Sequence, residues 1–151
     1  MRSHHTSIRT ADIHRAIAFY QALGFELQEQ FTTGYTLACW LKGPAGRLEL
    51  IQIPSPHSAP DAFGDEHYVG YYHLSFDLTD ELGIHRNLAT WLGGLCERLA
   101  AQSLPLKILL QPTQQIIGDR AYQVAFIADT DGLPLELLHD LGRAAELPDQ
   151  T

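Results

Sequence analysis

Two histidines and two glutamates stand at matching places in the two halves of this 151-residue chain. The halves open with one pattern, His5-x-Ser7-Ile8-x-x-x-Asp12 and His73-x-Ser75-Phe76-x-x-x-Asp80. They close with apolar segments that each carry one carboxylate, Leu48-Glu49-Leu50-Ile51 and Leu135-Glu136-Leu137-Leu138. A carboxylate in such a segment is costly to bury unless it is paired or binds a cation. The repeat therefore singles out His5, Glu49, His73 and Glu136.

Together, these four side chains suit one divalent transition metal. Two neutral imidazoles and two carboxylates balance its charge, and they leave two open positions in an octahedral shell, as a catalytic site requires. A single histidine or glutamate is more often exposed or satisfied in the core, but four at equivalent positions predict a shared metal site. His4 is the alternative to His5. The alternation of the first strand favours His5, because it puts His5, Ser7 and Arg9 on one face.

The elements that position these side chains follow from periodicity. The first half predicts a strand over 5–10, a helix capped by Asp12 and ended by Gly24, and strands over 25–31, 35–41 and 47–53. The second half predicts a strand over 71–78, a helix over 81–104 and strands over 106–110, 122–127 and 133–138, with an irregular connection over 112–119. Asp131-Gly132 is a strong hairpin signal. Residues 54–70, rich in Pro and Gly, are a linker or a loop over a site.

Composition excludes several classes of protein. The net charge is −8 without a basic cluster, which argues against nucleic-acid binding. No apolar run approaches the roughly 20 residues of a membrane span, and the polar start shows no signal peptide. Cys39 and Cys96 have the spacing of neither a zinc site nor a disulfide scaffold, so we expect two reduced thiols in a cytoplasmic protein.

The duplicated unit resembles the vicinal oxygen chelate superfamily, which includes glyoxalase I, extradiol dioxygenases, methylmalonyl-CoA epimerase and the fosfomycin and bleomycin resistance proteins. The segments that carry the resemblance are 5–12, 18–25, 70–73 and 129–137, and it extends over nearly the whole chain. It implies an α+β fold, in which two repeated βαβββ modules form a curved mixed sheet around a metal-binding concavity. We expect a single domain over 1–151, with module one at 4–54, a loop at 55–70, module two at 71–141 and a tail at 142–151.

Within this superfamily the chain is most similar to glyoxalase I, because a first-half glutamate, here Glu49, is usual there. The resemblance implies a metal-dependent lyase that isomerises the hemithioacetal of a 2-oxoaldehyde and a thiol by proton transfer through an enediolate. Glu136 is then the catalytic base that leaves the metal to move the proton, and Glu49 is the second candidate. Arg9 matches an arginine that binds the glutamyl carboxylate of glutathione. Ile51 and Ile53 would line an apolar wall of the substrate pocket.

Departures from the glyoxalase I pattern concern the thiol. Ile53 stands at a position where the glutathione-using members share an Asn. A basic cluster that could bind the glycine carboxylate of glutathione is absent from the sequence. We therefore expect poor activity with glutathione itself, and another thiol remains an alternative. The metal is left open among nickel, zinc, cobalt, manganese and iron. The expected partners are a small-molecule substrate and a second copy in a homodimer, with the site either within one chain or across the dimer.

Two other functions of the same superfamily stay open. An extradiol-type dioxygenase would hold ferrous iron on His5 or His73 and a glutamate, but the extra carboxylate counts against it. A non-enzymatic, bleomycin-resistance-like protein would bind its ligand in a groove at a dimer interface. Such proteins need no metal ligands, so four intact ligands count against that alternative.

Overall fold

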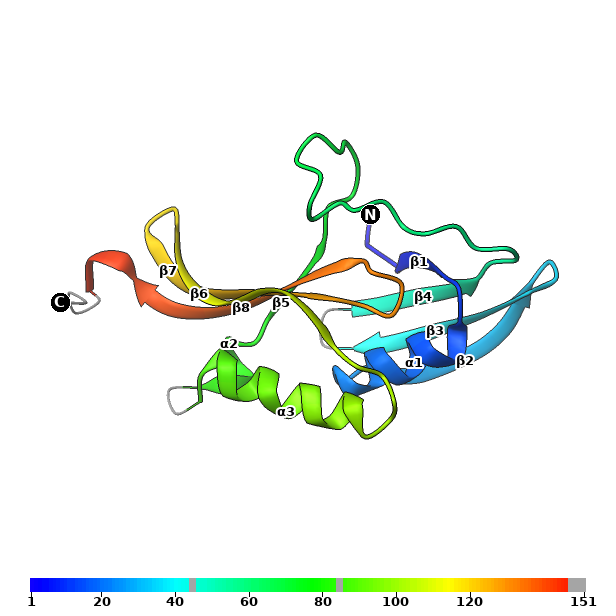
Figure 1. The fold of residues 1–151 in the computed structure, drawn as a ribbon, viewed down its shortest axis with the longest axis horizontal. Helices are drawn as coiled ribbons and strands as arrows, with labels where there is room; N and C mark the ends of the chain where they lie inside the picture. The colour runs from blue at the N-terminus through cyan, green and yellow to red at the C-terminus, as the bar shows by residue number, and fades with distance from the viewer. Residues whose placement is uncertain (44–45, 84–85, 147–151) are drawn as a thin grey trace.

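The computed structural model describes residues 1–43, 46–83 and 86–146 and shows two modules of one design (Figure 1). The first contains β1 (Thr6–Thr10), α1 (Ile13–Ala22), β2 (Glu26–Thr33), β3 (Thr36–Gly43) and β4 (Gly46–Gln52). The second contains β5 (Leu74–Asp77), α2 (Thr79–Leu82), α3 (Leu88–Ala100), β6 (Lys107–Ile117), β7 (Arg120–Ala128), β8 (Pro134–Arg143) and a 3-10 turn, η1 (Ala144–Glu146). The sheets have the orders β1-β4-β3-β2 and β5-β8-β7-β6, so the predicted α+β architecture of two βαβββ modules is confirmed.

Strand alternation decides which residues face the core. In each module the first strand pairs in parallel with the last, β1 with β4 and β5 with β8. Leu48 and Leu50 on β4 are buried in the core, as are Leu135 and Leu137 on β8. Successive side chains of a strand point to opposite faces. Glu49 and Glu136 therefore lie on the face of each sheet that the core does not use.

Helices cover the face of each sheet that lies opposite Glu49 and Glu136. The Asp12 side chain caps α1 by accepting from the backbone N–H groups of His14 and Arg15, and Gly24, at φ +92°, follows the helix end, as the sequence predicted. One hydrophobic core joins side chains of both modules, among them Ile17 of α1 and Leu95 of α3. Figure 1 shows the helices on one side of the sheets and the connection between β4 and β5 on the other. The helix-free face is therefore open for a site.

The turn between β7 and β8 ties the second module to the first. The Tyr20 hydroxyl donates to Asp129 Oδ2 at 3.0 Å, and the Thr10 hydroxyl donates to Asp131 Oδ2 at 2.6 Å. Asp129 also accepts from the backbone N–H groups of Asp131 and Leu133, which closes the predicted Asp-Gly turn. Burial raises the pKa of Asp129, and it also raises the pKa of Tyr20. The bond between them is enclosed and holds the two modules in one arrangement.

Several expected element boundaries were wrong. The strand expected over 71–78 spans only Leu74–Asp77, and β1 begins at Thr6, so both His73 and His5 lie one residue before their strands. The helix expected over 81–104 is divided, because α2 ends before Gly83, at φ +56°, and Asn87 caps α3. The connection expected over 112–119 is mostly strand, because Pro112 lies in the outer strand β6, where a missing N–H is tolerated.

The outer strands of both sheets are irregular. The pairing of β2 with β3 shifts between Leu27 and Glu29. The pairing of β6 with β7 shifts between Ile108 and Leu110 and again before Thr113. Each shift leaves extra residues on the outer strand, which is the pattern of a β-bulge. Across the part of the chain that the structure describes, no helix is both long and apolar enough to cross a membrane.

Candidate functional site

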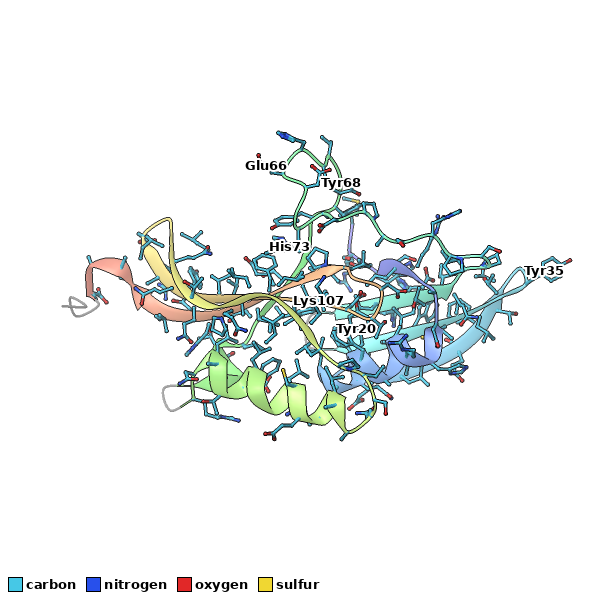
Figure 2. The ribbon with its side chains drawn as sticks, in the orientation of Figure 1. Tyr20, Tyr35, Glu66, Tyr68, His73 and Lys107 are labelled. Carbon is cyan, nitrogen blue, oxygen red and sulfur yellow. The ribbon has the colours of Figure 1, made fainter. Side chains whose placement is uncertain are left out.

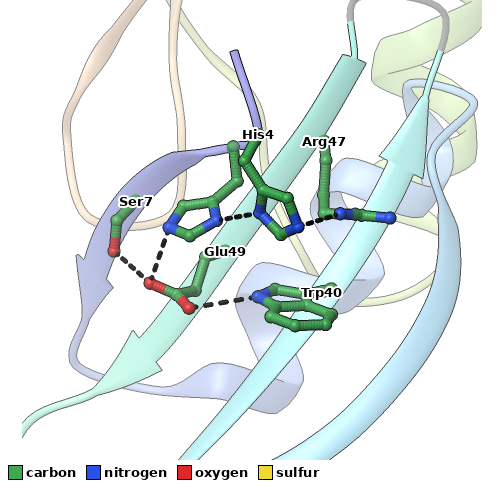
Figure 3. Close-up of polar contacts among 6 residues, drawn as sticks. His4, Ser7, Trp40, Arg47 and Glu49 are labelled. Atoms are coloured by element: carbon green, nitrogen blue, oxygen red, sulfur yellow. Dashed lines mark hydrogen bonds and ion pairs between the residues drawn. The ribbon is translucent and has the colours of Figure 1, made fainter. Parts of the chain in front are cut away.

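The first histidine and the first glutamate meet on module one. Ser7 on β1 lies beside Glu49 on β4, and His5 immediately precedes β1. His5 Nε2 lies 3.4 Å from Glu49 Oε2, and 15% of the Glu49 side chain is exposed. Figure 3 shows this pair on the sheet with its polar neighbours. An imidazole nitrogen and a carboxylate oxygen that already converge are two ligands in place for one cation.

Two donors hold the Glu49 carboxylate. The Ser7 hydroxyl donates to Oε2 at 2.8 Å, and the Trp40 indole N–H donates to Oε1 at 3.1 Å from the neighbouring strand β3. Burial raises the pKa of Glu49, but these two bonds, together with His5 and His4, outweigh burial and keep the pKa below its ordinary value. Glu49 is therefore a fixed and firmly ionised carboxylate.

The second histidine and the second glutamate form the same pair on module two. Glu136 on β8 lies beside Ser75 on β5, and His73 precedes β5. His73 Nε2 lies 3.3 Å from Glu136 Oε2. Figure 2 shows His73 on the same side of the sheets as the loop that carries Tyr68, opposite the helices. All four predicted ligands therefore lie on the helix-free faces.

Aromatic rings surround the second pair. Phe126 takes the place beside Glu136 that Trp40 takes beside Glu49, and its ring lies 5.1 Å from the His73 ring. The Tyr72 ring stacks on Phe126 with centroids 5.9 Å apart, and the Phe63 ring lies tilted against Phe126 at 5.1 Å. His73 Nδ1 is buried and has no hydrogen-bond partner among the described residues. The second pair is therefore surrounded by aromatic rings, and no N–H or O–H group among the described residues donates to Glu136 as Ser7 and Trp40 donate to Glu49.

A groove of about 1270 Å³ runs along the first strands of the two modules. Its lining includes His5, Ser7, Arg9, Ile53 and His73, together with the loop residues Tyr68, Tyr71 and Tyr72. Arg9 and Ile53, two predicted substrate contacts, thus face the same space as both histidines. The third, Ile51, pairs with Arg9 across β1 and β4. The groove thus brings two of the three predicted substrate contacts beside the two histidines of the predicted ligand set, whereas Ile51 is not part of its lining.

The structure gathers the four predicted ligands as two pairs and not as one cluster. Within residues 1–43, 46–83 and 86–146, no group of three or more His, Cys, Asp or Glu side chains is close enough to hold a metal. Each pair is half of the predicted set of four ligands, and its donor atoms are of the kinds that a divalent transition metal accepts, imidazole and carboxylate. The sequence analysis missed Trp40 and Phe126, which become neighbours of the glutamates only through strand register.

Similarity to known proteins identifies the superfamily of the chain. The model of the Glyoxalase/Bleomycin resistance protein/Dioxygenase superfamily matches residues 2–137. The chain belongs to this superfamily. Its members support more than one chemistry, so membership does not by itself identify the reaction. No curated protein matches the chain.

Solved structures share the fold at low sequence identity. A glyoxalase family protein from Enterococcus faecalis is 21% identical, with a TM-score of 0.62 over 91% of this chain and 97% of that one. A glyoxalase I mutant from Zea mays is 19% identical, with a TM-score of 0.63 over 91% of this chain but 44% of that one. The fosfomycin resistance protein FosX from Listeria monocytogenes is 15% identical, with a TM-score of 0.59 over 96% of this chain and 95% of that one. These similarities establish the fold alone.

Proposed function

We propose that this protein is a metal-dependent lyase of the glyoxalase I type, which isomerises the hemithioacetal of a 2-oxoaldehyde and a thiol. The observation that carries the proposal is the repeated pair, His5 with Glu49 and His73 with Glu136, at 3.4 and 3.3 Å. One carboxylate of the four ligands is held by two donors, whereas the other has a histidine and aromatic rings around it. One fixed and one freer carboxylate suit a reaction in which a single base moves a proton.

The complete site needs both kinds of pair around one ion. Because the two pairs do not gather in the described part of a single chain, we propose a homodimer in which His5 and Glu49 of one copy face His73 and Glu136 of the other. These four side chains would hold the metal. When bound, a divalent metal would polarise the oxygens of the substrate and stabilise the negative charge that develops on them.

Glu136 is the residue we assign as the base. It would take the proton from the thiol-bearing carbon of the hemithioacetal and return it to the neighbouring carbonyl carbon, which leaves a thioester. A carboxylate suits this step when few donors stabilise its ionised form. Glu49 already accepts from Ser7 and Trp40, so its role is to hold position. Ile53 and the tyrosines of the loop would enclose the organic part of the substrate in the groove.

The test is thioester formation from methylglyoxal with a panel of thiols, measured on metal-loaded protein. Glu136→Gln keeps the shape of the side chain but removes the base, so we expect a loss of about 10²–10⁴-fold in kcat. Glu49→Gln should reduce metal uptake more than it reduces kcat at saturating metal. We expect little turnover with glutathione, because Ile53 lines the groove where glutathione-using members have an Asn.

Other outcomes would redirect the assignment. An unchanged rate in Glu136→Gln would make Glu49 the base. If none of the thiols supports turnover by the metal-loaded protein, the lyase proposal fails. Consumption of dissolved oxygen would then identify a dioxygenase, whereas purified protein that takes up no metal would favour a ligand-binding protein.

A further inference from the structure

A line of hydrogen-bonded side chains leads away from the first metal pair. Arg47 Nη1 lies 2.7 Å from His4 Nε2, and His4 Nδ1 lies 2.8 Å from His5 Nδ1. His5 Nε2 then faces Glu49 Oε2 at 3.4 Å. Figure 3 shows the whole line on one face of the first module. The proposed function uses His5 and Glu49 but gives His4 and Arg47 no task.

Arg47 is fixed in place from two neighbouring strands. Its Nε donates to the Gln28 side chain on β2 at 2.9 Å, and its guanidinium carbon lies 5.1 Å above the Trp40 ring on β3. The His4 ring contacts the same indole edge-on, with centroids 5.4 Å apart. The guanidinium is thus aimed at His4 by contacts that do not involve His5.

The chemistry of arginine sets the direction of every bond in the line. A guanidinium has only donors, so His4 Nε2 must accept. A neutral imidazole carries one N–H, so His4 donates from Nδ1, and His5 accepts at its own Nδ1. His5 therefore carries its proton on Nε2, which faces Glu49 Oε2 at 3.4 Å. A protonated His4 or His5 would put two donors face to face at one of these contacts.

A metal at His5 requires the opposite arrangement. Coordination uses the Nε2 lone pair, and the other ring nitrogen then carries the proton and donates to a partner. His5 Nδ1–H would donate to His4 Nδ1, which would place the His4 proton on Nε2, against the N–H of Arg47. We propose that His4 and Arg47 are positioning residues that oppose metal at His5, so that metal occupancy and the Arg47–His4 bond exclude each other. This inference rests on the metal site of the proposed function.

The second module provides an internal contrast. Tyr72 occupies the place before His73 that His4 occupies before His5, and it contacts His73 through its ring, with centroids 4.4 Å apart. His73 Nδ1 has no hydrogen-bond partner among the described residues, so no chain of donors fixes its proton. Arg47 should therefore weaken metal binding by His5 and Glu49 and leave metal binding by His73 and Glu136 unchanged.

The first experiment needs no metal. Long-range nitrogen–proton NMR at about pH 8, where free imidazoles are neutral, should find His5 protonated on Nε2 and His4 protonated on Nδ1 in the metal-free protein. Arg47→Met keeps an apolar chain over Trp40 but removes the donors. In this variant neither His4 nor His5 should be restricted to one protonated nitrogen. Finding His5 protonated on Nδ1 in the wild-type protein would overturn the proposal.

The second experiment measures nickel or zinc affinity by calorimetry. Arg47→Met should tighten binding about tenfold, the size expected when a competing hydrogen bond from a charged group is lost. Lys42 lies opposite Arg47 on β3, so Lys42→Met removes an equal charge nearby and is the matched control. It should change the affinity by less than about twofold. In a His4→Phe background, Arg47→Met should have no further effect.

Two results of the calorimetry would overturn the inference while the metal site stands. An equal gain in metal affinity in Arg47→Met and Lys42→Met would mean that the loss of a positive charge alone explains the gain. Tightening by Arg47→Met that persists in His4→Phe would mean that the effect does not pass through His4. No metal uptake by the wild-type protein would instead overturn the proposed function and the opposition by Arg47 together, and the NMR result would then show whether the proton line itself exists.

Discussion

The two His–Glu pairs share a backbone position and differ in almost everything around it. On the first module, Ser7, Trp40 and His4 supply polar contacts to the pair. On the second module, Phe126, Tyr72 and Phe63 supply aromatic surfaces. The separations of the paired atoms are nevertheless 3.4 and 3.3 Å. The strands thus fix where the ligands stand, and their neighbours decide how each ligand behaves.

The difference divides the chemistry between the modules. The Glu49 carboxylate is stabilised in its ionised form by two donors, which keep its pKa below the ordinary value, whereas the neighbours of Glu136 are His73 and aromatic rings. Trp40 and Phe126 occupy equivalent positions beside the two glutamates. In the proposed function Glu49 is the anchor and Glu136 the base, and this one difference in residue type at a repeated position separates their surroundings. The predictions below test this contrast.

Removing either histidine should have the largest effect. We expect His5→Ala and His73→Ala each to lower the affinity for nickel or zinc by more than about 100-fold, since even the loss of a residue that only supports a ligand costs 10–100-fold. His14→Ala, on the exposed side of α1, is the control and should bind as the wild type does. Calorimetry and elemental analysis measure both. If only one histidine matters, the pairs do not share a metal. His85, expected to play no part, lies outside the described residues.

Exchanging the two aromatic neighbours should have an intermediate effect. Phe126→Trp would offer Glu136 the kind of indole donor that Glu49 has, and we expect kcat to drop about tenfold, because a hydrogen bond to the ionised carboxylate stabilises it against accepting a proton. Trp40→Phe should raise the pKa of Glu49 and leave kcat within about threefold. Carbon-13 NMR of the carboxylates and steady-state kinetics measure the two quantities. A larger loss of kcat from Trp40→Phe would reverse the assigned roles.

Removing the two equivalent serines should have the smallest effect. Ser7→Ala deletes a hydrogen bond to Glu49 and should reduce the free energy of unfolding by about 1 kcal/mol near neutral pH. Because this bond lowers the pKa of Glu49 in the folded state, the loss should be complete above the ordinary value of about 4.3 and should disappear as the pH falls through the folded value. Urea unfolding at several pH values measures it.

Ser75→Ala is the matched control for the serine experiment. Ser75 lies beside Glu136 in the same register, but no hydrogen bond joins the two side chains in the part of the chain that the structure describes. We expect a change within about 0.5 kcal/mol at every pH. Equal losses from the two serines would contradict the contrast between the pairs.

Much of the fold could be predicted from local signals. Asp12 and Gly24 bound α1 as expected, and Asp131-Gly132 forms the turn between β7 and β8. Alternation of side chains along β4 and β8 accounts for the position of Glu49 and Glu136 opposite the core. These features depend on residues close in sequence, so the pattern alone determines them. The metal and the roles of its ligands remain predictions.

Features that depend on distant residues could not be predicted. Trp40 and Phe126 contact their glutamates because β3 and β7 pair with β4 and β8 in one register. The line from Arg47 through His4 depends on contacts that β2 and β3 provide. The helix expected in the second half is divided at Gly83, which has a positive φ. The helical periodicity of the neighbouring residues gave no sign of this backbone conformation. In each case the missing information was tertiary.

The irregular outer strands have a consequence for solubility. An open sheet edge is a template on which a strand of another molecule can add, and continued addition produces aggregates. Two of the four edge strands are interrupted, β2 by the shift at Leu27 and β6 by the shifts on either side of Leu110. Because a bulge twists the edge and the proline at 112 offers no N–H, neither β2 nor β6 presents an unbroken ladder to an incoming strand. The fold thereby disfavours polymerisation through these two outer strands.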